Sequence, residues 1–299
     1  MQESSLHDHI YARSVGLAAG PGWTVVVGPG DDCAVLRSAG ADLLLLTVDQ
    51  LVEARHYTPG TDLDRIARKA IARSVSDIAA MGGSPAWATA TGVLPKNYPD
   101  ADALFDAMAR WANHWRCPLV GGDIASHGST DHPLTLTVTV GGSVPAGHHP
   151  VLRSGARPGD RLWLTGPVGG SFASARHLTF EPRIEQGLLA SRDGSGVSAM
   201  IDLSDGLGRD ADRIARASGV VIEIDAHAVP LHPGLADWRA GAGEGEDYEL
   251  LIAAPSKPHI PGLLGPIGTV RAATGDEPPG AHFREDDARH PARDLGWDH

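Results

Sequence analysis

The chain has 299 residues, with 42% hydrophobic and 21% charged side chains, which is ordinary for a globular protein and enough for two domains. Its formal net charge of -12 opposes nucleic acid and anionic membranes, so we expect neither as a partner. Two cysteines, Cys33 and Cys117, are too few for a disulfide framework or a zinc site, and this favours a cytoplasmic protein.

The first half of the chain alternates strand and helix signals. Residues 1–20 lack a basic segment followed by an apolar core, so they do not resemble a signal peptide. The apolar run at 43–48 predicts a buried strand, and the strict alternation at 134–140 predicts a half-buried one. Between them, one apolar stripe over 62–81, stopped by two glycines, predicts a helix.

Residues 144–159 are rich in Pro, Gly and His, and this composition predicts a junction between domains at 1–142 and 150–299. In the second half, the pattern predicts a helix over 205–218 that Gly219 closes. The strands expected there cover 161–165, 200–202, 220–224 and 247–253. Because strands and helices alternate in both halves, the fold class is α/β or α+β.

Aspartates recur at glycine turns, strand ends and helix ends. Each of them alone could simply cap a turn or a helix, as Asp62 and Asp205 could. Together they favour a site for divalent cations, because Mg²⁺ prefers oxygen ligands and shares them with substrate phosphates. Such ions would also reverse the local sign of an acidic protein. The chain has neither a Walker P-loop nor a protein-kinase signature.

Several segments, in this order, resemble the thiamine-monophosphate kinase family of the aminoimidazole ribonucleotide synthetase-like superfamily. They are GPGDDCA at 28–34, DQLVEARH at 49–56, SDIAAMG at 76–82, GGD at 121–123, RSGARPGD at 153–160, IDLSDGL at 201–207, GEDYEL at 245–250 and the terminal GWDH at 296–299. The first segment is shared across the superfamily. The segments at 201–207 and 245–250 and the terminal segment are far more specific to the kinase.

The resemblance implies the two-domain fold of that superfamily, with an N-terminal metal- and ATP-binding domain that dimerises through its sheet and a C-terminal α+β domain. It also implies direct in-line transfer of the γ-phosphoryl group of ATP to thiamine monophosphate, giving thiamine diphosphate. Several Mg²⁺ ions would take part, and the protein would be a homodimer.

The same resemblance implies the site residues. The metal ligands would be Asp32, Thr47, Asp49, Asp77, Asp123, Asp202 and Asp205. The ATP contacts would be Gly122, Asp123, Arg153 and Ser204, and the substrate contacts would be His56, Glu246 and Trp297. No catalytic residue is implied beyond this positioning of metal and phosphate, because the attacking phosphate oxygen is already anionic. Val48 stands where the family usually has Thr.

Two other functions stay open from the sequence. One is another ATP-dependent enzyme of the superfamily that resembles a ribonucleotide amide cyclase, although the segments at 201–207 and 245–250 speak against it. The other is a nucleotide-binding relative without catalytic activity. Modification of the chain's own C-terminal cysteine is excluded, because no cysteine follows Cys117.

Overall fold

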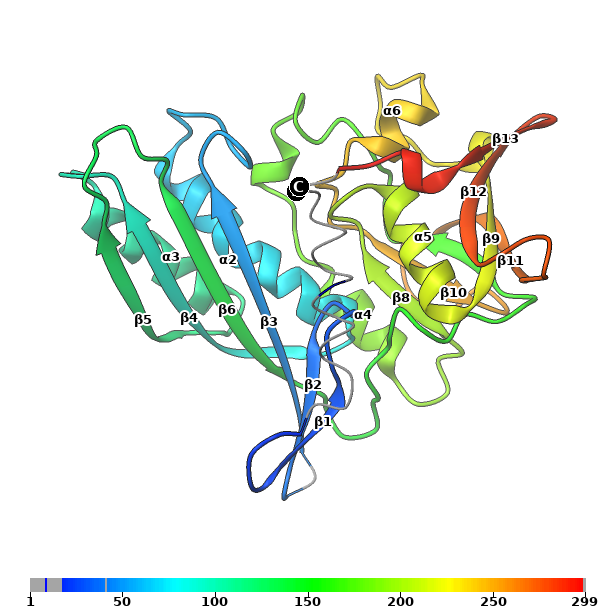
Figure 1. Cartoon of the computed structure of the whole chain (residues 1–299), viewed down its shortest axis with the longest axis horizontal. Helices are drawn as coiled ribbons and strands as arrows, with labels where there is room; N and C mark the ends of the chain where they lie inside the picture. Colours follow the sequence, from blue (N-terminus) through cyan, green and yellow to red (C-terminus); the bar gives the residue numbers. More distant parts are fainter. Residues whose placement is uncertain (1–8, 10–17, 41, 298–299) are drawn as a thin grey trace.

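The computed structural model describes residues 9, 18–40 and 42–297 (Figure 1). Most of the segment judged not to be a signal peptide, and the last two residues of the terminal GWDH, lie outside these ranges. Among the described residues, no helix combines the length and the apolar character needed to cross a membrane.

The first sheet is formed by the N-terminal half of the chain. Its strands are β1 (Trp23–Val27), β2 (Ala34–Ser38), β3 (Leu43–Val52), β4 (Ser84–Leu94), β5 (Leu119–Ser126) and β6 (Thr135–Ser143). They lie in the order β1-β2-β3-β6-β4-β5, and only the β4–β5 pair is parallel. Helices α2 (Leu63–Ala80) and α3 (Ala101–His114) pack on one face of this sheet (Figure 1).

The second sheet is formed by the C-terminal half. Its strands are β7 (Arg161–Leu164), β8 (Ala199–Asp202), β9 (Val220–Asp225), β10 (Leu250–Ala254), β11 (Leu264–Ala272), β12 (Gly280–Glu285) and β13 (Ala288–Pro291). They lie in the order β13-β12-β9-β11-β7-β10-β8, with β9–β12 as the parallel pair. The helices of this half are α4 (Ile184–Ser191), α5 (Leu207–Ser218) and α6 (Trp238–Gly243), with short 3-10 helices at Arg176–Leu178, Ala226–Ala228 and Ala292–Asp294. Two mixed sheets with helices agree with the predicted α/β or α+β class.

Helix α2 is shared by the two halves. The Asp62 side chain caps its first turn by accepting from the Arg65 N–H at 3.2 Å, and Gly82, with φ +68°, follows its end. On one side α2 packs against β3 and β6, and on the other it packs against α4 and β8. The helix is therefore buried on most of its surface, including polar positions such as Lys69 and Ser76.

The predicted elements are present, with shifted ends that have local causes. Strand β10 begins at Leu250 and not at residue 247, because Glu246 and Tyr248 adopt the left-handed conformation, with φ of 58° and 54°. Helix α5 begins at Leu207 because the residue before it, Gly206, has a non-helical backbone conformation with φ +111°. Asp205 consequently lies in the loop between β8 and α5, where its side chain can serve a site.

The junction of α2 with α4 predicts a large effect of Gly82→Ala on stability. A Cβ at Gly82 would lie 2.2 Å from the Cβ of Ser191, whose hydroxyl donates to the Gly82 carbonyl at 2.8 Å. Gly219 has the same φ of +68° but no atom within 4 Å of such a Cβ. We expect Gly219→Ala to cost about 1 kcal/mol of unfolding free energy through backbone strain, and Gly82→Ala to cost about 1–3 kcal/mol more through steric overlap. Urea unfolding measures both, and equal losses would contradict this account of the junction.

Candidate active site

Three carboxylates from distant segments meet between the two sheets. Asp32 lies just before β2, Asp77 in the last turn of α2, and Asp202 at the end of β8. One carboxylate oxygen from each lies within 4.8 Å of the others. The sequence predicted that these three acids would serve one site, and the fold brings them together.

Neighbouring side chains hold each carboxylate in place. Thr47 Oγ1 donates to Asp77, and Ser76 Oγ donates to Asp202 at 2.5 Å. The Arg153 guanidinium donates to Asp32 Oδ1, with Nη2 at 2.5 Å and Nε at 3.2 Å. The other oxygen of Asp32, Oδ2, is buried and accepts no hydrogen bond from the described part of the chain. A buried carboxylate oxygen in this position is suited to a cation.

The electrostatics of the cluster also call for a positive ion. Burial raises the pKa of Asp77 well above its usual range, and the charges of Asp49 and Asp202 raise it further. The pKa of Asp202 is likewise raised by burial and by the Asp32 carboxylate. Burial and Asp32 also raise the pKa of Asp31 to about 7. Ionised carboxylates this close repel one another, so they need protons or cations, and an all-oxygen ligand set fits Mg²⁺.

Asp49 and Asp205 lie beside the cluster, and each is paired with an arginine. Asp49 is two residues along β3 from Thr47, on the same side of the strand, and pairs with Arg73 at 3.4 Å. Asp205 pairs with Arg213, whose guanidinium also reaches Asp210 at 2.6 Å. These two acids border the site, while the three-carboxylate cluster forms its centre.

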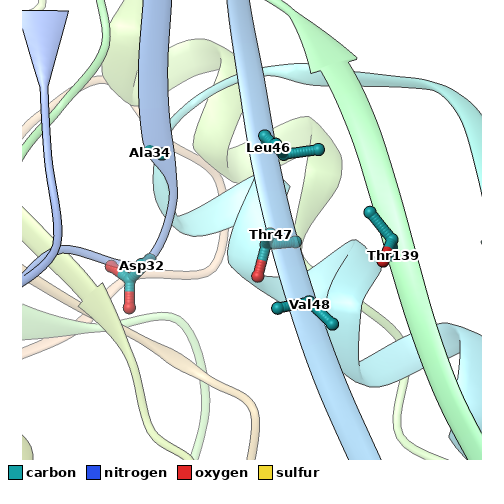
Figure 2. A pocket seen from close by; sticks show the side chains of 6 residues that line it. All are labelled: Asp32, Ala34, Leu46, Thr47, Val48 and Thr139. Atoms are coloured by element: carbon teal, nitrogen blue, oxygen red, sulfur yellow. The ribbon is translucent and has the colours of Figure 1, made fainter. Parts of the chain in front are cut away.

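A pocket of about 460 Å³ opens next to the cluster. Figure 2 shows its lining side chains, with Asp32 on one side and Thr47 and Val48 of β3 on the other. Thr139 of β6 and the apolar Ala34 and Leu46 complete the lining. The pocket therefore places a carboxylate and hydroxyl groups next to open space.

The three predicted substrate contacts converge in a second region. Lys69 Nζ of α2 donates to the His56 carbonyl at 2.7 Å and forms an ion pair with Glu246. The ring of Phe172 stacks on that of Trp297, with centroids 5.5 Å apart and an interplanar angle of 18°. Lys69 Nζ lies 5.8 Å from the centroid of the Phe172 ring. His56, Glu246 and Trp297 thus share one set of neighbours.

The predicted ATP contacts are divided between two places. Arg153 is part of the cluster, and Ser204 lies in the β8–α5 loop, where its carbonyl accepts from the Glu246 N–H at 2.8 Å. Gly122 and Asp123 lie on β5, at the far edge of the first sheet, where the Asp123 side chain is exposed.

The strand register shows how far Gly122 is from the cluster. Asp49 is aligned with Val138, Ala90 and Gly122 across successive strands. Three strand spacings, roughly 14 Å, therefore separate Asp49 from Gly122. The described chain does not bring Gly122 or Asp123 to the cluster, and their roles stay predictions.

The sequence prediction missed Lys69, Arg73 and Phe172. A signal existed for the first two, because they lie three and seven residues after Ile66, at the spacing of the apolar stripe of α2, where Lys69 is buried and Arg73 half-buried. A cation in a core-facing position needs a partner and so points to a site. Phe172 gave no comparable signal, because its contact with Trp297 joins residues far apart in the sequence.

Comparison with known proteins gives consistent matches. Residues 30–144 match the family model of the AIR synthase related protein, N-terminal domain. A thiamine-monophosphate kinase of Salmonella typhimurium is 37% identical over 259 residues, covering 77% of each chain, and one of Escherichia coli K12 is 36% identical over 264 residues with the same coverage. A solved structure of AaThiL complexed with AMPPCP and TMP has a TM-score of 0.81 and 26% identity, and the match covers 100% of this chain and 97% of that one.

The raised pKa values of Asp77 and Asp202 predict a stability that depends on pH and cations together. The unfolded chain releases these protons near the usual value of about 3.8, whereas the folded cluster retains them. The free energy of unfolding of the metal-free protein should therefore fall as the pH rises from about 5 to about 8. Mg²⁺ at about 100 times its Kd should raise the unfolding midpoint by roughly 5 °C at the higher pH, and by less at the lower pH, where protons compete.

Thermal unfolding in EDTA and in Mg²⁺ at both pH values measures this linkage. The variant Asp202→Asn, which lacks one of the titrating groups, should show a smaller pH dependence in EDTA. An equal effect of Mg²⁺ at both pH values would rule out the cluster as its site.

Proposed function

The chain belongs to the thiamine-monophosphate kinase family, and from this premise we propose that it transfers the γ-phosphoryl group of ATP to thiamine monophosphate, giving thiamine diphosphate and ADP. The observation that carries the proposal is the cluster of Asp32, Asp77 and Asp202, which offers carboxylate oxygens to cations beside an open pocket. Phosphoryl transfer requires mainly positioning and charge neutralisation, and this cluster is suited to both.

The residues of the cluster would hold the Mg²⁺ ions. Asp32, Asp77 and Asp202 supply the central carboxylates, and Thr47, Asp49 and Asp205 lie next to them. Asp123 would be a further ligand, although the fold places it on β5 at the far edge of the first sheet. When bound, the ions would neutralise charge on the phosphate groups that react. Arg153 is held beside Asp32 and would contact ATP there. The other proposed ATP contacts are Ser204, in the β8–α5 loop, and Gly122, at the far edge of the first sheet.

The region around His56, Glu246 and Trp297 would receive thiamine monophosphate. The thiazolium ring is a cation, and a carboxylate and an aromatic face both attract a cation. His56 Nδ1 accepts the Val52 N–H at 2.9 Å, so in the neutral ring Nε2 carries the proton and can donate to a phosphate oxygen. The attacking phosphate oxygen is already anionic, so no side chain has to remove a proton from it.

We further propose that the protein is a homodimer that forms through the first sheet, with its two domains at 1–142 and 150–299. The large apolar side chains that are exposed in the described chain all belong to strands of this sheet. They are Trp23, Val26, Val48, Val120 and Ile124. Val48 is 62% exposed and points away from α2, because its neighbour Thr47 contacts Asp77 on that helix. Val48 thus leaves an apolar side chain exposed on the sheet face that α2 does not cover, which favours an interface on that face.

The activity itself is tested by the variant Asp77→Asn. The purified protein should form thiamine diphosphate from ATP, Mg²⁺ and thiamine monophosphate. Asp77→Asn should lower kcat roughly 10²–10³-fold, because it removes a charge that holds the cations. Asp286→Asn is the matched control, since this aspartate is 85% exposed on the β12–β13 turn. Direct measurement of the product by chromatography decides, and ATP hydrolysis without thiamine diphosphate would indicate another acceptor.

The proposed dimer is tested by Val48→Asp. A charge at this exposed apolar position should weaken the proposed interface and shift the protein towards a monomer, because a charge buried without a partner is costly. Ala236→Asp introduces the same charge at an exposed position of the second half and should leave the mass in solution unchanged. Sedimentation of the three proteins provides the measurement. A wild-type monomer, or a dimer that survives Val48→Asp, would contradict this interface.

A further inference from the structure

Lys69 is a fully buried cation in the middle of α2. Its side chain has 0% exposure, and a lysine is rarely found in such a place unless its charge is paired. Its amino group forms the ion pair with Glu246 and donates to the His56 carbonyl at 2.7 Å. Because Lys69 is closed off from solvent, it acts on a ligand through these partners.

The two partners of Lys69 belong to segments that no strand pairing joins. His56 lies in the turn between β3 and α2, whereas Glu246 lies in the loop before β10. Glu246 has a left-handed backbone with φ of +58°, a conformation that persists only where the surroundings hold it. The ion pair with Lys69 stabilises this conformation, since it connects the Glu246 loop to helix α2.

The third side of the amino group faces an aromatic pair. Nζ lies 5.8 Å from the Phe172 centroid, and Phe172 stacks on Trp297. Burial lowers the pKa of Lys69 to about 8, and the Glu246 carboxylate acts in the opposite direction, so the amine stays mostly charged at neutral pH. The Lys69 ammonium group therefore bonds to His56 and Glu246 directly, and it faces Phe172, the ring that stacks on Trp297.

We propose that Lys69 is a positioning residue for thiamine monophosphate. Its amino group fixes the His56 turn and the Glu246 loop at one separation, so that both face the same ligand. This inference rests on the proposed function, and it adds a residue outside the predicted site. The aspartate cluster, which would hold the cations, lies further along α2, and Lys69 does not contact it, so we expect Lys69 to affect the binding of thiamine monophosphate and not that of ATP.

The variant Lys69→Met separates this role from a general structural one. We expect its KM for thiamine monophosphate to rise at least roughly tenfold, because small misplacements of binding groups have large effects, while its KM for ATP stays unchanged. Arg68→Met is the matched control on the same helix. Arg68 is also buried and pairs with an acid, Glu181, at 2.9 Å, but its ring neighbours are Trp111 and Trp115. Loss of the Arg68 side chain should lower the thermal unfolding midpoint and leave the KM values for thiamine monophosphate and ATP unchanged.

The outcomes are distinguishable. A wild-type protein that forms no thiamine diphosphate would refute the proposed function and the role of Lys69 with it. An active wild type, combined with a Lys69→Met variant whose KM for thiamine monophosphate is unchanged or rises together with that for ATP, would refute the role of Lys69 alone. An equal rise in Arg68→Met would refute it as well. Should Lys69→Met not fold, Lys69→Gln keeps a donor for the His56 carbonyl but lacks the charge, and the same comparison of KM values decides.

Discussion

Mutual repulsion among buried carboxylates is the constraint on which the rest of the site depends. Asp32, Asp77 and Asp202 lie within 4.8 Å of one another, and burial keeps the pKa of the latter two high. Arg153 offsets part of this charge at Asp32, and two hydroxyl groups donate to the other two acids. The remaining negative charge of the cluster is not compensated by the protein, and a divalent ion can neutralise it. The acidity of the chain and its use of an anionic substrate are compatible for this reason.

Helix α2 sets the distance between the two parts of the site. Lys69 and Asp77 are eight residues apart on the helix, which corresponds to roughly 12 Å along its axis. One end of the helix thus serves the aspartate cluster, and a position two turns earlier serves the aromatic and acidic region. A ligand with a phosphate at one end and a cationic ring at the other matches this polarity. The same helix packs on both sheets, so the separation is fixed by the core of the protein.

Local patterns in the sequence predicted the elements, and the positions of the acids relative to glycines predicted the centre of the site. The limits of helix α2 were predictable because Asp62 caps one end and Gly82 follows the other. The position of Asp123 was not, because it depends on the order of the strands, and β5 pairs at the far edge of its sheet. Strand order is decided by packing between distant segments and leaves no periodic trace in the sequence.

The contacts around the substrate region were beyond prediction for a similar reason. Two neighbours of Lys69, Phe172 and Glu246, lie more than a hundred positions from it in the sequence. The sequence indicates that Glu246 contacts the substrate only through its resemblance to the family. The left-handed backbone conformation of Glu246 is seen only in the folded chain. The resemblance therefore identified the predicted substrate contacts, while only the fold shows which residues they contact.

A helix wedged between two sheets has a consequence for motion. Enzymes with a cleft between two domains commonly open and close it by rotating the domains about a flexible connection. Here α2 packs against β3 and β6 on one side and against α4 and β8 on the other. Such a rotation would have to separate α2 from one of these two sets of contacts. Entry and exit during turnover then fall to smaller local segments, such as the loop that carries Phe172, whose ring stacks on that of Trp297.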